Sequence, residues 1–256
     1  MTSSNLLQIH GLSKNFGGLQ ALDDIHFSCE VGETLGIIGP NGAGKTTLFN
    51  LITGFTRASA GTAYFRDDNI TNVSASEICR MGISRTFQGI RLFRQMTVWE
   101  NVWLGQNFKA QYHVPPFWRR NRDEKAMRDE VESLLEDFHL STRRDFLASE
   151  LSFGDMRRLE ICRALATKPD LLLLDEPASG LSPVETQQLM DDLRRLSAKG
   201  LTTILIEHDM NVALGLSDNV VVLNFGKLLA LGPPADIRKD PRVVEAYLGS
   251  AGEEHA

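Results

Sequence analysis

The segment Gly39–Thr47 (GPNGAGKTT) constrains this chain more than any other feature of its sequence. It matches the pattern G-x-x-x-x-G-K-[ST], in which a glycine-rich turn joins a strand to a helix and directs backbone N–H groups at phosphate oxygens. An apolar stretch, Thr34–Ile38, precedes it, and a helix-compatible stretch begins at Lys45. The sequence therefore predicts an α/β fold with a phosphate site between a strand and the N-terminus of a helix.

The residues of this loop are the predicted contacts to a nucleotide. The amine of Lys45 is expected to reach the β- and γ-phosphates, and the hydroxyl of Thr46 is expected to ligate Mg²⁺. A nucleoside triphosphate and Mg²⁺ are therefore the predicted ligands, and the family resemblance described below implies that the nucleotide is ATP. The predicted nucleotide-binding residues of the loop are Gly39, Pro40, Asn41, Gly42, Ala43, Gly44, Lys45, Thr46 and Thr47.

A second motif, Leu171–Pro177 (LLLLDEP), places two acidic residues at the end of an apolar strand. Asp175 is expected at the carboxyl edge of the sheet, where it would hold the hydration shell of Mg²⁺. Glu176 is then positioned to polarise the attacking water. An apolar run before two acids is also typical of a strand that merely enters a turn, but the phosphate loop in the same chain favours the catalytic interpretation.

Composition excludes several other classes of protein. The chain has 42% hydrophobic and 23% charged residues, which is sufficient for a sizeable core, and its net charge of -6 argues against a nucleic-acid surface. Cys29, Cys79 and Cys162 are scattered without metal-ligand spacing, so we expect reduced, at least partly buried thiols. No apolar run approaches the roughly 18–20 residues that span a bilayer, and the N-terminus does not resemble a signal peptide.

Strand and helix patterns alternate near both ends of the chain, whereas the middle is mainly helical. We expect a largely parallel sheet from this alternation. Residues 97–138 are predicted to be mainly helix, interrupted at Pro115–Pro116. Gly200 is expected to close the helix that begins near Pro183. Strands are predicted at Leu6–His10, Ile25–Cys29, Thr34–Ile38, Ala63–Phe65, Leu171–Leu174, Thr202–Ile206 and Val220–Leu223.

The segment Leu151–Leu165 (LSFGDMRRLEICRAL), here called the signature segment, resembles the signature of ABC transporter ATPases, usually written LSGGQ. In that family the residues at the positions of Ser152 and Gly154 contact the γ-phosphate bound to the opposite subunit. A hydroxyl and a small residue at a helix start suit an anion for physical reasons as well. Two residues depart from the family pattern. Phe153 replaces the first signature glycine, and Ser182 stands where an aspartate is usual after the acidic strand.

Three further residues match the same family in order along the chain. Phe16 lies where an aromatic side chain stacks on adenine. Gln88 matches the glutamine that joins Mg²⁺ and the water to the transmembrane contact region. His208 matches the histidine that contacts the γ-phosphate. The resemblance implies that Glu176, His208 and Gln88 are catalytic and that Thr46, Gln88 and Asp175 hold the metal.

The resemblance covers about residues 5–250 and implies one ABC ATPase domain over residues 1–256. Its α/β phosphate-loop core, about residues 5–89 and 165–250, would include an antiparallel β portion near the N-terminus. A helical subdomain, about residues 90–164, would be inserted into that core. The implied reaction is hydrolysis of ATP to ADP and phosphate. A complete site would form only in a head-to-tail dimer, with an identical or a related ATPase.

One branch of the family, the ATP-binding subunits of branched-chain amino-acid importers, is the most similar. FGGLQAL, RTFQGIRLF, the form of the signature segment with Asp155, and the ending RVVEAYLG carry this similarity. It implies transmembrane permease subunits, an indirect substrate-binding protein, no nucleic acid, and a peripheral location on the cytoplasmic face of the inner membrane. The alternatives are the ATPase of a lipid or lipopolysaccharide exporter and a soluble ABC ATPase that acts on nucleic acid.

The segment after Gln88 is rich in large apolar side chains. We expect Leu92, Phe93 and Met96 to line a groove that receives a short permease helix. Trp99 and Trp103, four residues apart on a predicted helix, are equally compatible with the ordinary core.

Overall fold

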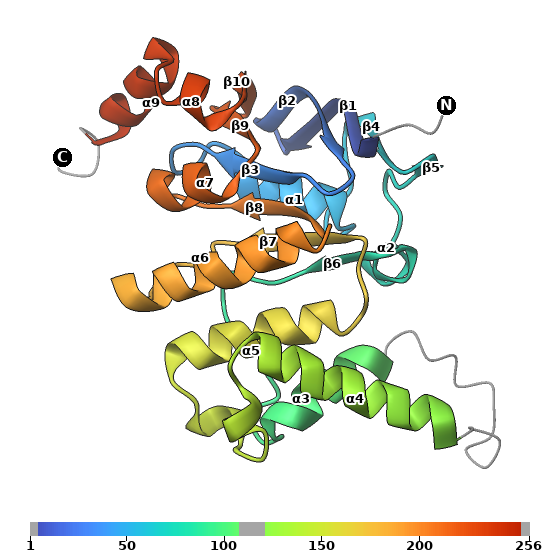
Figure 1. Ribbon diagram of the computed structural model, residues 1–256. Helices are drawn as coiled ribbons and strands as arrows, with labels where there is room; N and C mark the ends of the chain where they lie inside the picture. Colours follow the sequence, from blue (N-terminus) through green and yellow to red (C-terminus); the bar gives the residue numbers. More distant parts are fainter. Residues whose placement is uncertain (1–4, 108–120, 252–256) are drawn as a thin grey trace.

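The structure is a computed structural model that describes residues 5–107 and 121–251. An antiparallel four-stranded sheet lies at the upper right of Figure 1, most strands of a six-stranded sheet cross its middle, and helices α3, α4 and α5 lie below. The four-stranded sheet has the order β2-β1-β4-β5. Its strands are β1 (Asn5–Phe16), β2 (Leu19–Glu30), β4 (Ala60–Phe65) and β5 (Asp68–Asn69).

The six-stranded sheet has the order β10-β9-β3-β8-β7-β6. All its neighbours pair in parallel except β10, which is antiparallel to β9. Its strands are β3 (Thr34–Ile38), β6 (Ile83–Arg85), β7 (Leu171–Asp175), β8 (Thr202–Ile206), β9 (Asn219–Asn224) and β10 (Lys227–Gly232). Buried strands with helices on both faces have continuous apolar sequences, and LLLL of β7 has this pattern.

Alternating side chains of β7 divide the core between two faces of this sheet. Leu171 and Leu173 pack in the same cluster as helix α1 (Lys45–Ile52), whereas Leu172 and Leu174 pack with α5 (Phe153–Leu165) and α6 (Pro183–Ala198). The helix after the phosphate loop and the helix of the signature segment therefore cover opposite faces.

The helical part consists of α3 (Val98–Asn107), α4 (Asn121–Asp137), η2 (Ser141–Arg143), η3 (Ala148–Glu150) and α5. Helix α5 joins this part to the sheet, because its buried side chains share one cluster with those of α3, α4, β7 and α6. Trp99 and Trp103 stack with their ring centroids 4.9 Å apart and pack on this cluster. Of the two interpretations of these tryptophans, core packing is thus the one that the structure favours.

The remaining helices are α2 (Ala75–Met81), α7 (Met210–Leu216), α8 (Pro234–Ile237) and α9 (Pro241–Ala251). Ile38, Val220 and Val222 form a third cluster with residues of α7, α8 and α9. Gly200 follows the end of α6 with a φ of 89°, as predicted for a glycine that closes a helix.

The predicted fold class is confirmed: the structure has a mixed α/β core, an N-terminal antiparallel sheet and a helical part. Strands β3 and β8 have the predicted bounds. The short strand β6, the edge strand β10 and the C-terminal helices were not predicted. The predicted break at Pro115–Pro116 lies outside the described residues, and the subdomain boundary near residues 90 and 164 stays a prediction.

Candidate functional site

The phosphate loop has the conformation that only its glycines allow. Gly39 has a φ of 154°, and a Cβ there would lie 2.2 Å from the backbone oxygen of Leu223. Gly44 is the N-cap of α1 with a φ of 101°, and a Cβ there would lie 2.7 Å from the backbone oxygen of Ala21. Any side chain at these two positions would therefore displace the loop from the neighbouring backbone.

Lys45 folds back on the loop. Its Nζ donates hydrogen bonds to the backbone oxygens of Gly39 at 2.6 Å and Pro40 at 3.0 Å. Burial lowers the pKa of the Lys45 amine, and the carboxylates of Glu176 and Asp175 partly oppose this shift. The amine and both acidic side chains thus interact within one site.

Asp175 ends β7 and is buried. Its Oδ2 accepts a hydrogen bond of 2.7 Å from Nη2 of Arg85, which ends β6. The Arg85 guanidinium also donates to Oδ1 of Asn50 at 2.7 Å and to Oγ1 of Thr53 at 3.2 Å, both at the end of α1. Sequence reasoning missed Arg85, because its partner on the neighbouring parallel strand is 90 positions away.

Glu176, Gln88 and His208 lie together. Nε2 of Gln88 donates to Oε2 of Glu176 at 3.0 Å, and Nδ1 of His208 lies 4.0 Å from the same oxygen. Three segments that are far apart in sequence therefore meet at one carboxylate. The predicted neighbourhood of these side chains exists in the structure, whereas their catalytic roles stay predictions.

The predicted metal ligands supply the right kind of donor for Mg²⁺. The hydroxyl of Thr46, the carboxylate of Asp175 and the amide of Gln88 are oxygen donors, which Mg²⁺ prefers together with water and phosphate oxygens. Nε2 of Gln88 is turned to Glu176, and Oε1 is the atom of this amide that would ligate a cation. Across residues 5–107 and 121–251, no group of three or more His, Cys, Asp or Glu residues forms a metal cluster of its own.

Glu207, the residue before His208, is a buried carboxyl group that sequence reasoning missed. It is 1% exposed, and its Oε1 accepts a hydrogen bond of 2.8 Å from the backbone N–H of Ala178. Burial raises its pKa to about 7, and nearby Glu176 adds to the rise, while the Ala178 N–H and His208 oppose it. One glutamate after a strand gives no sequence signal, so only the fold reveals it.

The signature segment starts α5 with Ser152 as its N-cap. Oγ of Ser152 accepts from the N–H of Asp155 at 3.2 Å and donates to Oδ2 of Asp155 at 2.7 Å. The same carboxylate forms ion pairs with Arg143 and Arg158. Before this hydroxyl can donate to a phosphate, it must leave the Asp155 carboxylate.

Both departures from the family pattern have a structural role. The ring of Phe153 packs against Gly180 in the loop after β7. The approach is so close that a Cβ on Gly180 would lie 3.0 Å from Cε1 of Phe153. Ser182 is the N-cap of α6 and forms a capping box with Glu185. Serine and aspartate are both favoured N-caps, so Ser182 keeps the helix start that an aspartate would give.

Phe16, the predicted adenine platform, ends β1 and is 49% exposed. The Nζ of Lys14 lies 4.6 Å from the centroid of its ring. An exposed ring whose face attracts a cation suits a stacking role. Its contact with adenine stays a prediction.

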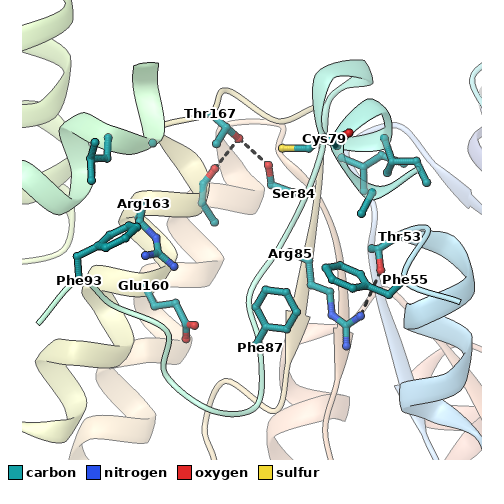
Figure 2. Close-up of a pocket in the computed structure, with 17 residues that line it drawn as sticks. Thr53, Phe55, Cys79, Ser84, Arg85, Phe87, Phe93, Glu160, Arg163 and Thr167 are labelled. Carbon is teal, nitrogen blue, oxygen red and sulfur yellow. Dashed lines mark hydrogen bonds between the residues drawn. The ribbon is translucent and has the colours of Figure 1, made fainter. Parts of the chain in front are cut away.

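A cavity of about 580 Å³ lies between the core and the helical part (Figure 2). The rings of Phe55, Phe87 and Phe93 point into it, and Arg85, Glu160 and Arg163 add charged groups. The Arg85 guanidinium lies within 6 Å of the ring centroids of Phe55 and Phe87. Arg85 thus contacts both the cavity's aromatic lining and Asp175.

Of the three residues predicted to line the permease groove, Phe93 also lines this cavity. Phe93 is 52% exposed and lines the cavity. Leu92 packs against the helical cluster instead, and Met96 is not part of the cavity wall. The chain between β6 and α3 turns Phe87 and Phe93 toward the cavity. That Leu92, Phe93 and Met96 together receive a permease helix stays a prediction.

A phosphate loop, an acidic strand and a capped signature helix on one such sheet define a nucleotide-hydrolysing cassette. The chain belongs to the ABC transporter family, because the model of that family matches residues 22–179. Residues 227–253 match a second family model, described as "Branched-chain amino acid ATP-binding cassette transporter". It is accordingly an ATPase. No helix within the described residues is both long and apolar enough to span a membrane.

Known relatives match almost the whole chain. The high-affinity branched-chain amino acid transport ATP-binding protein LivG of Escherichia coli K12 is 44% identical over 97% of this chain and 100% of its own length. BraF of Pseudomonas aeruginosa is 41% identical over the same shares. The ADP conformation of an ATP-binding cassette of an ABC transporter is 36% identical, with a TM-score of 0.84 over 96% of this chain and 99% of that chain.

Proposed function

We propose that this ATPase powers the import of branched-chain amino acids from the cytoplasmic face of the membrane. The names of LivG and BraF support the substrate class, since both match nearly all of this chain. The match of residues 227–253 to a branched-chain amino acid family supports it independently, because this segment lies beyond the catalytic motifs. Permease subunits bind the transported molecule, and a substrate-binding protein delivers it to them.

The observation that carries the proposed mechanism is the meeting of Gln88, Glu176 and His208 beside the phosphate loop. Glu176 polarises the attacking water, and Gln88 and His208 orient the water and the γ-phosphate. Lys45 exchanges its two carbonyl partners for phosphate oxygens when ATP binds, because a charge-assisted bond to phosphate is stronger. Thr46, Gln88 and Asp175 would hold Mg²⁺, which would supply positive charge to neutralise the phosphates.

The nucleotide site is completed by a second subunit. Ser152 and Gly154 start α5, which covers the face of the sheet opposite to α1. A signature segment on another subunit, arranged head to tail, would supply the second side of the nucleotide. The partner is an identical chain or a related ATPase.

The cavity of Figure 2 is the proposed docking site of the permease. Its aromatic walls suit the apolar face of a short helix, and its volume of about 580 Å³ accommodates several side chains. Arg85 lines the cavity and donates a hydrogen bond to Asp175, so it connects the cavity to the proposed metal site. The core, the helical part and the permease thus meet at one place.

Uptake of radiolabelled leucine tests the proposal in cells that lack the gene for this chain. We expect the wild-type chain to restore uptake and Glu176→Gln not to restore it. The chain should also co-purify with permease subunits from detergent-solubilised membranes. Normal leucine uptake in the deleted strain, together with a defect in lipid export, would contradict the import assignment and favour the lipid-exporter alternative.

A further inference from the structure

Glu207 connects two segments that carry proposed catalytic side chains. It directly precedes His208, and its Oε1 accepts the hydrogen bond from Ala178, two residues after Glu176. The end of β8 and the loop after β7 are therefore joined by one buried carboxyl group.

Among residues 5–107 and 121–251, a single oxygen of this carboxyl group, Oε1, has a hydrogen-bond partner. Oε2 is buried, and no hydrogen-bond partner for it lies among the described residues. A buried carboxyl group with an unpaired oxygen destabilises a fold, and an apolar side chain of similar size would remove that penalty. Packing alone therefore does not explain a glutamate at position 207. Penalties of this kind are tolerated where a site needs the group.

The loop after β7 needs an external support. Glu176 has a φ of 49°, a left-handed conformation that is uncommon for a non-glycine residue and that the surroundings must hold. Its N–H donates to the backbone oxygen of Ile206 at 2.9 Å, which fixes the start of the loop on β8. The bond from Ala178 to Glu207 fixes the loop to the same strand end two residues later.

We infer that Glu207 is a positioning residue for hydrolysis, which holds the backbone after Glu176 at a fixed position relative to His208. The inference rests on the proposed roles of Glu176 and His208. Glu207 acts through Ala178 and does not touch the reacting atoms. A displacement of about 1 Å at a catalytic group lowers the rate by about 10²-fold, so a loop that is held at one point only is expected to hydrolyse ATP slowly.

The carboxyl group performs this role in both protonation states. Its raised pKa of about 7 means that both forms are populated near neutral pH. Each form keeps an oxygen that accepts from the Ala178 N–H, and the amide oxygen of glutamine keeps one as well. Leucine has a similar volume and no acceptor.

Two substitutions in the full-length chain separate positioning from packing. Glu207→Leu is expected to lower kcat for ATP at least about tenfold, with unchanged affinity for a fluorescent ATP analogue and no loss of stability in urea. Glu207→Gln is expected to retain most of kcat, because it keeps the acceptor. A merely structural role would instead make stability and kcat fall together.

Glu33 provides the matched control at the opposite edge of the sheet. Its carboxylate accepts from the N–H of Glu30 at 2.6 Å and from Nδ2 of Asn219 at 2.9 Å, so it also supports a turn. Glu33→Leu should change stability and leave kcat unchanged.

The outcomes that overturn the inference differ from those that overturn the proposed function. A Glu207→Leu chain that hydrolyses ATP at the wild-type rate overturns it, as does a folded Glu207→Gln chain that loses hydrolysis. If Glu207→Leu does not fold, hydrogen exchange of the Ala178 amide in the wild-type chain decides, and an unprotected amide overturns the inference. Normal hydrolysis by Glu176→Gln would instead remove the proposed catalytic role on which the inference rests.

Discussion

Gln88 donates a hydrogen bond of 3.0 Å to Oε2 of Glu176, across a gap of 88 positions in the sequence. Gln88 also lies in the segment that connects β6 to Phe93, a residue of the cavity in Figure 2. The backbone oxygens of Phe87 and Gln88 accept from the buried guanidinium of Arg157 in α5 at 3.1 and 3.0 Å. The proposed catalytic carboxylate, the cavity and the signature helix therefore share one connecting segment.

Replacing Glu176 by glutamine tests the proposed catalytic role of this carboxylate. The amide cannot take a proton from water, and general-base catalysis contributes about 10²–10⁴-fold, so we expect kcat to fall by that factor. Nucleotide affinity should stay unchanged, because Lys45 and the phosphate loop are intact. Phosphate release measures the first quantity, and titration with a fluorescent ATP analogue measures the second.

Lys45→Ala is the matched comparison for that variant. It removes the charge that is expected to bind the phosphates, so affinity itself should fall, by about tenfold or more. If both variants bound ATP equally well and hydrolysed it, the proposed site would be in the wrong place.

Gly154→Asp tests the composite site of the proposed dimer. We expect ATPase activity to disappear while the monomer still binds nucleotide, because the new carboxylate would face the partner's γ-phosphate. The structure adds a local effect, since a Cβ at position 154 would lie 2.5 Å from Oε1 of Glu185. Glu185 caps α6 through Ser182, and loss of a cap destabilises by about 1 kcal/mol.

Gly154→Ala is the control for this local effect, because it displaces Glu185 without adding a charge. Urea denaturation and ATPase assays of both variants separate the two contributions. Equal activities of the alanine and aspartate variants would show that displacement of Glu185, and not charge, is responsible. Loss of nucleotide binding by the monomeric aspartate variant would contradict the dimer hypothesis.

Phe93→Asp tests the docking cavity. A carboxylate among the rings of Phe55 and Phe87 would oppose an apolar helix, so we expect the chain to bind ATP and to lose its association with membranes. Phe146 is the control, since it is 50% exposed against 52% for Phe93 and lies in the helical part outside the cavity. Membrane pull-down of the two aspartate variants is the measurement. Equal association of both with membranes would exclude the cavity as the docking site.

The sequence predicted those elements whose signal is local. The phosphate loop GPNGAGKTT and the apolar strands β3 and β8 are each recognisable from a run of consecutive residues, and both strands have the predicted bounds. The strand β6 has only three residues and pairs with β7 across an insertion, so no local pattern marks it. Leu92 and Phe93 are both apolar neighbours, and the sequence alone does not show that Phe93 lines the cavity while Leu92 packs on the helical cluster. The Arg85–Asp175 pair and Glu207 depend on neighbouring parallel strands, whose order a sequence pattern does not give.

The raised pKa of Glu207 predicts a pH dependence of stability. An acid whose pKa rises from 4.5 when unfolded to about 7 when folded binds more protons in the folded state between these pH values. Stability therefore falls as pH rises through this window, and the loss is complete above pH 7. A tenfold change in proton affinity corresponds to about 1.4 kcal/mol, so Glu207 lowers the free energy of unfolding by roughly 3 kcal/mol across this pH window.

Comparison with Glu207→Gln isolates this contribution, since the amide does not titrate and other groups change equally in both chains. The free energy of unfolding, obtained from urea titrations between pH 4.5 and 8, should decrease for the wild-type chain relative to the variant as pH rises. The interactions with neighbouring His208 lower the pKa of Glu207, so His208→Ala should raise that pKa further and move the window to higher pH. A constant difference in stability between the two chains at all pH values would show that Glu207 does not titrate in this window.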